Sequence, residues 1–113
     1  MDVSTLAPPP PPLLFPKSAV EADLRGELIE AVKIEASIRG IVLPTVLGQI
    51  AKAAVQIDSL VVVSILCNVE PILGFELPHS VVPAGGFDSV ESALEHLLPR
   101  IEKEWIKRKG AKL

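Results

Sequence analysis

The sequence predicts an all-α fold, a small bundle of four main helices with one long connecting loop. The chain has 113 residues, 49% of them hydrophobic, which suits one domain with a single compact core. Apolar residues recur at helical spacing in several stretches. The β-branched run that follows residue 59 could form a strand, but no partner strand with turn signals is evident, so helix is favoured.

Charge and composition exclude several classes of protein. Residues 1–99 carry five Lys and Arg against twelve Asp and Glu, whereas residues 100–113 carry six against two. An acidic body argues against a nucleic-acid partner, because that affinity depends on basic residues that neutralise phosphates. The chain lacks an apolar run of about 18 residues and a secretory signal pattern, so we expect a cytoplasmic protein without a membrane span. One cysteine and two histidines make a metal site improbable.

Composition divides the chain into three parts. Residues 1–17 contain the run Pro8–Pro12, which favours extended polyproline II, and we expect a disordered tail. Residues 18–99 form the domain, and residues 100–113 form a basic helical extension. A solvated helix end explains that extension, although contact with RNA or anionic lipid stays an alternative.

The first helix is expected to begin at Ser18, which has capping-box spacing to Glu21, and to end at Gly40. Residues 41–44 then form an extended link, and a short helix follows from Thr45 to about Val55. The expected core positions of these two helices are Val20, Leu24, Leu28, Ala31 and Val32, then Val46, Leu47, Ile50, Ala51 and Ala54.

A third helix should start where Asp58 or Ser59 can act as the N-cap, and it should decay between Pro71 and Gly74. At about 100° per residue, its apolar side chains share one arc, and the small and polar ones lie opposite or at the edge. The apolar arc contains Val62, Ile65, Leu66, Val69, Ile72 and Leu73, whereas Ser64, Cys67 and Pro71 lie opposite, with Val61 and Asn68 at one edge.

The last helix should begin with Asp88 and Glu91 in capping-box spacing, after a loop or short helical turn through Val82. Pro99 predicts a kink or a restart near Leu98. The expected buried positions are Val90, Ala93, Leu94 and Leu97, extended beyond the proline by Ile101, Trp105 and Ile106.

Four short stretches, in order, resemble the acyl and peptidyl carrier proteins. Ile57-Asp58-Ser59-Leu60 is similar to the Asp-Ser-Leu attachment motif of that family, and an apolar helix follows it. Phe75-Glu76-Leu77-Pro78 resembles the stretch after the family's second helix, and Val81 and Val82 fall where its short third helix lies. Phe87-Asp88-Ser89-Val90 resembles the start of its final helix. The resemblance covers about residues 20–98.

This resemblance implies a four-helix bundle of acyl-carrier-protein type. The short helix expected before the motif would be an addition to that bundle. It implies that Ser59 receives a 4′-phosphopantetheine arm, that Asp58 is the acid beside it, and that Leu60 is an apolar contact. A helix start suits that attachment, because its first amides lack internal partners and favour an anionic phosphodiester. No residue near Ser59 in sequence activates its hydroxyl, so a separate transferase that uses coenzyme A and Mg²⁺ is implied.

The implied function is that of a carrier and not of an enzyme. The arm thiol holds acyl or aminoacyl groups as thioesters, which a loading enzyme supplies and an accepting enzyme consumes. A specialised lipid, fatty-acid, polyketide or other secondary-metabolite pathway fits this function, and we expect a monomer.

Two features depart from the family pattern. The outward face of the third helix lacks the acidic residues that usually pair with basic enzyme patches, so docking should depend on apolar area and shape. Residues 51–56 are apolar and helical in character, where the family has an acidic, glycine-containing approach. Either an extra helix replaces that loop, or Ser59 is presented differently and is not modified. The expected partner-binding residues on the outward face are Val61, Ser64, Cys67, Asn68 and Glu70.

Two other functions stay open. The chief alternative is an unmodified carrier-fold adaptor that binds a partner protein through its apolar helix face. A lipid-surface protein that uses the basic tail around Trp105 is the other. For Cys67, His79 and His96 we expect ordinary packing, loop and surface roles.

Overall fold

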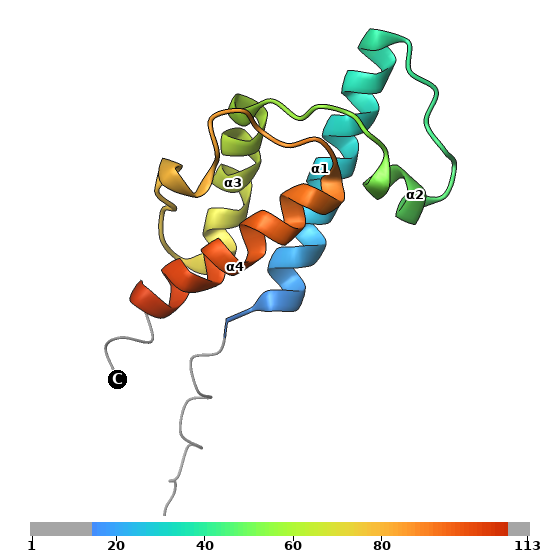
Figure 1. The fold of residues 1–113 in the computed structure, drawn as a ribbon. Coiled ribbons are helices and arrows are strands. Elements are labelled where there is room, and N and C mark those ends of the chain that lie inside the picture. Colours follow the sequence, from blue (N-terminus) through green and yellow to red (C-terminus); the bar gives the residue numbers. More distant parts are fainter. Residues whose placement is uncertain (1–14, 109–113) are drawn as a thin grey trace, which may run out of the picture.

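The computed structural model describes residues 15–108, and these are helical with no strands. The elements are α1 (Lys17–Arg39), α2 (Leu47–Lys52), α3 (Ser59–Leu73), the 3₁₀ turn η1 (His79–Val81) and α4 (Val90–Arg108). The all-α class is therefore confirmed. α1 packs against both α3 and α4, while short α2 lies at the end of the molecule where α1 finishes (Figure 1). Within residues 15–108, no helix is long and apolar enough to span a membrane.

The start of α1 differs from the predicted capping box. The N-cap is Pro16 and no side chain caps the helix, so the prediction of Ser18 and Glu21 is wrong. Proline suits this position because its ring holds φ near the helical value, and the Pro16 carbonyl accepts the first helical bond from Val20 at 3.0 Å. Phe15 packs against Trp105 with ring centroids 6.1 Å apart, so residues 15–17 of the predicted tail belong to the folded domain. Residues 1–14 lie outside the described residues.

The buried face and the end of α1 follow the prediction. Gly40 takes the left-handed conformation (φ 70°) that ends the helix, and Ile41 donates to the Ala36 carbonyl at 2.8 Å. Ala31 is only partly buried, whereas Ile29 and Ala36 join the core. The other predicted core positions are buried, namely Val20, Leu24, Leu28 and Val32.

α2 is shorter than the predicted helix over 45–55. It ends at Ala53, whose extended backbone (ψ 139°) turns the chain so that Val55 reaches the core. Ile50 and Ala51 are buried as predicted, but the predictions for three other core positions are wrong. A helix of about one and a half turns can bury only one of its sides. Val46, Leu47 and Ala54 are therefore exposed.

α3 begins after the N-cap Asp58 and runs through Pro71 to Gly74, which ends it with φ 86°. Pro71 sits inside the last turn without ending the helix earlier. Ile72 is 38% exposed and so does not share the buried arc. The rest of the predicted arc is buried, namely Val62, Ile65, Leu66, Val69 and Leu73, and the predicted opposite side (Ser64, Cys67, Pro71) is exposed.

α4 is capped one residue later than predicted. The Ser89 hydroxyl accepts from the Ser92 amide at 3.1 Å, and the Ser92 hydroxyl accepts from the Ser89 amide at 3.2 Å. These reciprocal bonds form the capping box that was predicted for Asp88 and Glu91. The predicted core positions Val90, Ala93, Leu94 and Leu97 are all buried.

The helix α4 is continuous across Pro99, so the predicted restart near Leu98 is wrong. A helix held by packing on both sides of a proline tolerates the one lost donor. Beyond it, Ile101 is fully buried and Trp105 is 8% exposed, although Ile106 is 54% exposed. Residues 100–108 therefore share the core of the domain instead of extending from it, and residues 109–113 lie outside the described residues.

Replacing Ile101 with alanine tests whether this segment belongs to the core. We expect the free energy of unfolding to fall by about 2–5 kcal/mol, because a fully buried side chain leaves a cavity. The matched control is Ile106→Ala, five residues along the same helix and half exposed, for which a loss within about 0.5 kcal/mol is expected. Urea unfolding followed by circular dichroism measures both, and equal losses would contradict the assignment.

Candidate functional site

The candidate site is the first turn of α3. Ser59 is its first helical residue and is partly exposed. The Asp58 carboxylate accepts from the Leu60 amide at 2.7 Å, which satisfies one of the amides that a helix start leaves without a partner. Within the described residues, the amides of Ser59 and Val61 have no hydrogen-bond acceptor. The site therefore combines an accessible hydroxyl with two uncommitted N–H groups at the positive end of a helix.

A short bridge holds this turn in place. Ile57 and Phe87 exchange two main-chain hydrogen bonds, with N···O distances of 2.7 and 2.9 Å, and both side chains are buried. The Gln56 side-chain amide also donates to the Gly85 carbonyl at 2.7 Å. The segment before Ser59 is thus attached to the segment before α4, although nearly thirty residues separate them in sequence.

Gly86 permits the close approach of these two segments. Its φ of 71° is left-handed, and a Cβ atom there would lie 1.9 Å from the Ile57 carbonyl oxygen and 3.0 Å from the Ser59 nitrogen. A side chain at this position cannot coexist with the bridge. The Gly85-Gly86 pair is the signal in the sequence that could have indicated a positive φ next to the site.

Asp58, Ser59 and Leu60, the residues predicted to form an attachment motif, make up the N-cap and first turn of α3, and Leu60 is strongly exposed, at 77%. No described residue donates to or accepts from the Ser59 hydroxyl. Among residues 15–108, no group of three or more His, Cys, Asp or Glu side chains could hold a metal ion.

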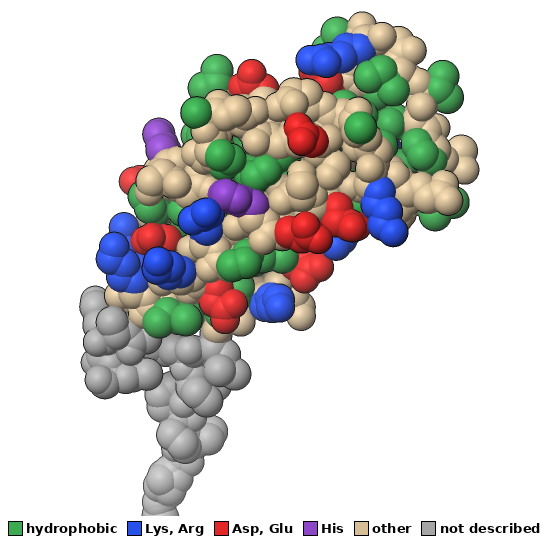
Figure 2. All heavy atoms as spheres, in the orientation of Figure 1, with side chains coloured by type: hydrophobic (Ala, Val, Ile, Leu, Met, Phe, Trp, Pro, Cys, Tyr) green, Lys and Arg blue, Asp and Glu red, His purple; other side chains and the backbone are tan. Residues whose placement is uncertain are grey.

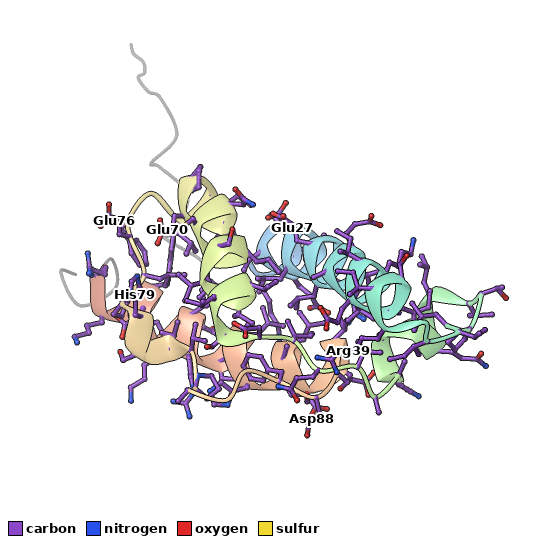
Figure 3. The ribbon with its side chains drawn as sticks, turned by 90° about the horizontal axis from the view of Figure 1, so that it is seen from above. Glu27, Arg39, Glu70, Glu76, His79 and Asp88 are labelled. Atoms are coloured by element: carbon purple, nitrogen blue, oxygen red, sulfur yellow. The ribbon has the colours of Figure 1, made fainter. Side chains whose placement is uncertain are left out.

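The predicted partner-binding residues on α3 fall into two groups. Val61, Ser64 and Cys67 are exposed and make no side-chain hydrogen bond to other described residues. Asn68 donates to the Glu27 carboxylate on α1 at 3.1 Å, and Figure 3 shows Glu27 on the side of α1 that approaches α3.

Glu70 accepts from the Leu77 amide at 2.8 Å and so fixes the loop that follows α3. Glu70 is the one carboxylate of α3 and the only acidic residue that the sequence predicted near the outward face. The hydrogen bond from Leu77 directs this carboxylate to the loop after α3. Apart from Glu70, α3 carries no charged side chain, and its exposed large aliphatic side chains are Leu60, Val61 and Ile72.

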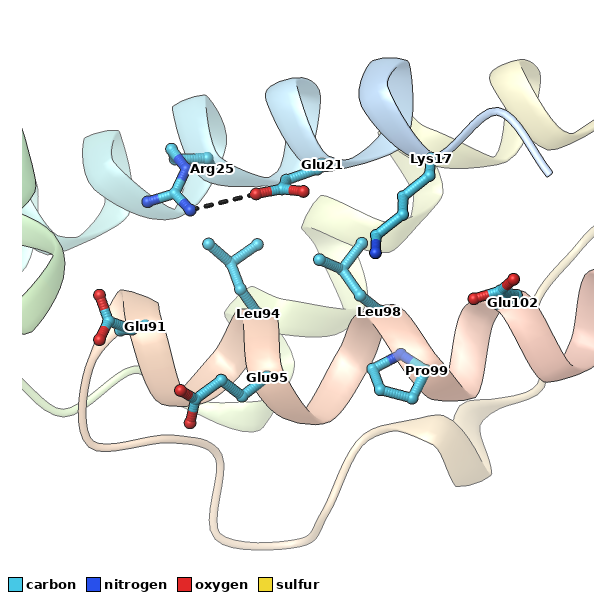
Figure 4. A pocket seen from close by; sticks show the side chains of 9 residues that line it. All are labelled: Lys17, Glu21, Arg25, Glu91, Leu94, Glu95, Leu98, Pro99 and Glu102. Carbon is cyan, nitrogen blue, oxygen red and sulfur yellow. Dashed lines mark hydrogen bonds and ion pairs between the residues drawn. The ribbon is translucent and has the colours of Figure 1, made fainter.

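A surface hollow of about 440 Å³ lies between α1 and α4, and it does not include the Ser59 turn. Figure 4 shows Leu94 and Leu98 pointing from α4 toward α1, with charged side chains around them. Glu21 and Arg25 on its α1 side already form an ion pair at 3.3 Å. Small-molecule sites are mainly apolar with few polar groups, whereas this hollow is lined mostly by charged residues, so we assign no ligand to it.

Trp105, His79 and His96, which the sequence assigned to no predicted site, have ordinary structural roles. Trp105 is buried against Phe15, so it is not an exposed anchor for a lipid surface. His79 belongs to η1, and His96 on α4 accepts from Arg100 Nε at 2.7 Å and packs against Phe87 with ring centroids 5.3 Å apart. Partial burial, and then the Arg100 guanidinium, lower the pKa of His96 from its ordinary value of 6.5.

The chain was compared with known protein families, with curated proteins and with solved structures, and no match was found.

Gly86→Ala should destabilise the protein strongly. The left-handed φ costs roughly 1–2 kcal/mol for a residue with a side chain, and the contact with the Ile57 carbonyl adds to that. The control is Gly85→Ala, because a Cβ atom there would meet nothing within 4 Å, and its effect should stay within about 0.5 kcal/mol. Urea unfolding compares the two, and similar stabilities would contradict the close approach described above.

His96 should make stability depend on pH. Because its pKa is lowered in the folded state, the unfolded state binds more protons as the pH falls through 6.5. The stability that neutral His96 contributes is therefore present above pH 6.5 and is lost as the pH falls below that value. Between about pH 7.5 and pH 5.5, the free energy of unfolding should fall less in His96→Gln than in the wild type. A slope unchanged in His96→Gln would refute the prediction.

Proposed function

We propose that the protein is an acyl carrier in which Ser59 bears a 4′-phosphopantetheine arm and the arm thiol holds acyl or aminoacyl groups as thioesters. The observation that carries the proposal is the position of the Ser59 hydroxyl, partly exposed on the first residue of α3 beside two uncommitted amides. A phosphodiester at this point meets N–H donors and the positive end of the helix. A serine in the middle of a helix has neither.

The residues around Ser59 suit such a group. The Asp58 carboxylate accepts a hydrogen bond from the Leu60 amide. This bond directs the carboxylate toward the helix and partly offsets its charge. Gly86 has no side chain, so the main chain beside the Ser59 nitrogen stays uncrowded. The two hydrogen bonds of the Ile57–Phe87 bridge hold the turn in one position. A fixed position favours recognition by an enzyme that must select one hydroxyl.

The proposed transfer needs a second protein. The Ser59 oxygen forms a bond to the phosphorus of coenzyme A that carries the pantetheine, the phosphoanhydride bond breaks, and adenosine bisphosphate leaves. The hydroxyl proton passes to a base, and no described residue is hydrogen-bonded to the Ser59 hydroxyl to serve as one. A phosphopantetheinyl transferase with Mg²⁺ supplies that base in this proposal.

The order of the elements also supports the proposal. The helix that Ser59 begins is followed by η1, at the place of the short third helix in carrier proteins, and then by the capped final helix. α2 is the extra short helix before the motif. We propose that these elements form a bundle of acyl-carrier-protein type.

The exposed face of α3 indicates how partner enzymes dock. It presents the aliphatic side chains Leu60, Val61 and Ile72, and its one carboxylate, Glu70, accepts a hydrogen bond from Leu77 in the loop after α3. Docking to loading and accepting enzymes therefore depends on apolar contact instead of electrostatic steering. The same face would serve an unmodified adaptor, which is the second candidate function.

Intact mass measurement separates the two candidates. After incubation with coenzyme A, Mg²⁺ and a permissive phosphopantetheinyl transferase, the full chain should gain the mass of one phosphopantetheine. Ser59→Ala should gain none, while Ser64→Ala, which removes an exposed hydroxyl five residues further along α3, should gain the same mass as the wild type. Circular dichroism shows that each variant is folded.

No mass gain by the folded wild-type chain would reject the carrier and favour the adaptor. A gain that survives in Ser59→Ala would reject the assignment of the site.

A further inference from the structure

A surface hollow with three basic side chains lies between α4 and η1, and it does not include the Ser59 turn. Its volume is about 270 Å³. Figure 2 shows Lys and Arg side chains gathered at the end of the molecule where α4 finishes. We refer to it as the α4–η1 hollow, and its lining residues are Ser80, Val81, Arg100, Lys103, Glu104 and Lys107.

The three cations form a single row on α4. At about 100° per residue, Arg100, Lys103 and Lys107 lie within about 60° of one another on the helical wheel. Three acids of α4 lie on another side of the helix, about 180–220° from Arg100. These acids are Glu91, Glu95 and Glu102. The helix therefore separates its charges by sign.

The cations of the row have no acidic partner among residues 15–108. Three ion pairs form within α1, whereas none forms within α4. Glu104 lines the same hollow, and Glu95 lines a neighbouring hollow with Arg100 and Lys103, but neither acid pairs with a described cation. Lys103 and Lys107 are four residues apart, and like charges at that spacing destabilise a helix. An anion bound in the hollow would remove this repulsion.

The helix dipole explains only part of this basic charge. Cations stabilise the C-terminus of a helix, but the effect is confined to the last turn, which contains Lys107 and Arg108. Arg108 also has an aromatic partner, because its guanidinium lies 5.1 Å from the centre of the Phe75 ring. Arg100 and Lys103 lie more than one turn before the end of α4, where the dipole contributes little.

The hollow presents hydrogen-bond donors from two elements. Arg100 Nε donates to His96 Nε2 at 2.7 Å, which holds the guanidinium and leaves its two terminal nitrogens without an acceptor among the described residues. On the η1 side, the exposed Ser80 hydroxyl has no hydrogen-bond partner within the described part of the chain. Val81 in the same turn is buried and attaches η1 to the core. Guanidinium, ammonium and hydroxyl donors therefore line one hollow.

We propose that the α4–η1 hollow binds a phosphate monoester group, with the three cations as its counter-charges and the Ser80 hydroxyl as a further donor. Arg and Lys side chains are the usual partners of phosphate oxygens in proteins. Three cations and the single carboxylate of Glu104 leave an excess of two positive charges in the hollow. A phosphate monoester carries about 1.5 to 2 negative charges at pH 7, so the charges match.

A long polyanion fits this surface less well. Nucleic acid presents one charge per phosphate along an extended strand, and the acids on the other side of α4 repel its continuation. The contacts in the hollow select the phosphate group and not the alcohol to which it is esterified. The group can therefore belong to a soluble phosphate ester or to the headgroup of phosphatidic acid. The site is separate from the acyl arm proposed for Ser59, and neither inference depends on the other.

An NMR titration of the full chain with glycerol 3-phosphate tests the site. In phosphate-free buffer at constant ionic strength, amide signals should shift to saturation, with the largest shifts at the residues that line the hollow. Replacing Lys103 and Lys107 together with glutamine should raise the dissociation constant at least about tenfold, because two charge-assisted contacts are lost.

The matched control replaces Lys33 and Lys52 together with glutamine. It removes the same charge from two exposed lysines outside the hollow, so the dissociation constant should stay within about twofold of the wild-type value. Circular dichroism shows that both double variants keep the fold.

Vesicle flotation distinguishes the two sources of the phosphate group. Phosphatidylcholine vesicles that contain phosphatidic acid present a phosphate monoester, whereas those with phosphatidylglycerol present an anionic diester. Flotation with phosphatidic acid alone, lost in the Lys103 and Lys107 double variant, assigns the group to the lipid. Saturable binding of glycerol 3-phosphate without flotation assigns it to a soluble ester.

Three results would overturn the proposal. The first is a wild type that binds neither glycerol 3-phosphate nor phosphatidic acid. The second is binding that the Lys33 and Lys52 control weakens as much as the Lys103 and Lys107 variant does. The third is equal flotation with phosphatidic acid and phosphatidylglycerol, which would indicate a general attraction to anionic surfaces.

Discussion

The pair of main-chain hydrogen bonds between Ile57 and Phe87 is the constraint on which the candidate site depends. Ile57 lies two residues before Ser59, and Phe87 lies three residues before the start of α4, so this bridge sets where both helices begin relative to each other. Gly86 makes the approach possible, because its left-handed backbone and missing side chain let the Ile57 carbonyl come close. The two helix starts then receive their caps independently, from Asp58 and from Ser89.

The polar groups of α3 are used mainly inside the molecule. Glu70 holds the loop after the helix and Asn68 reaches α1, so the surface that remains near Ser59 is apolar or weakly polar. The strongly charged surfaces lie elsewhere, on α4 and along α1, where several charges are paired within one helix. Exposed ion pairs of this kind contribute little stability, so the fold depends on its apolar core. The exposed aliphatic side chains at the start of α3 (Leu60) and near the end of α1 (Ile34, Ile38) are consequently well suited to protein contacts.

Helix boundaries show why some sequence predictions were wrong. A capping box is a local pattern, and both Ser18 with Glu21 and Asp88 with Glu91 have its spacing. The helix start is chosen by where the preceding chain can pack, and Phe15 against Trp105 moves the start of α1 to Lys17. In the same way, Pro99 breaks an isolated helix, but Ile101 and Trp105 on its far side bury enough surface to keep α4 continuous.

The sequence by itself determined the helical class, the buried faces of α1, α3 and α4, the αL glycine that ends α1, and the position of Ser59 at a helix start. These features follow from side-chain periodicity and local backbone preference, which act over a few residues. Only the tertiary structure decided that Ile57 and Phe87 form a bridge and that Gly86 must lack a side chain. It also decided that Glu70 accepts a hydrogen bond from Leu77, and that Ile34 and Ile38 near the end of α1 stay exposed. These features join segments far apart in sequence, or depend on the surface that other helices leave uncovered. A local sequence pattern predicts neither, because it extends over only a few residues.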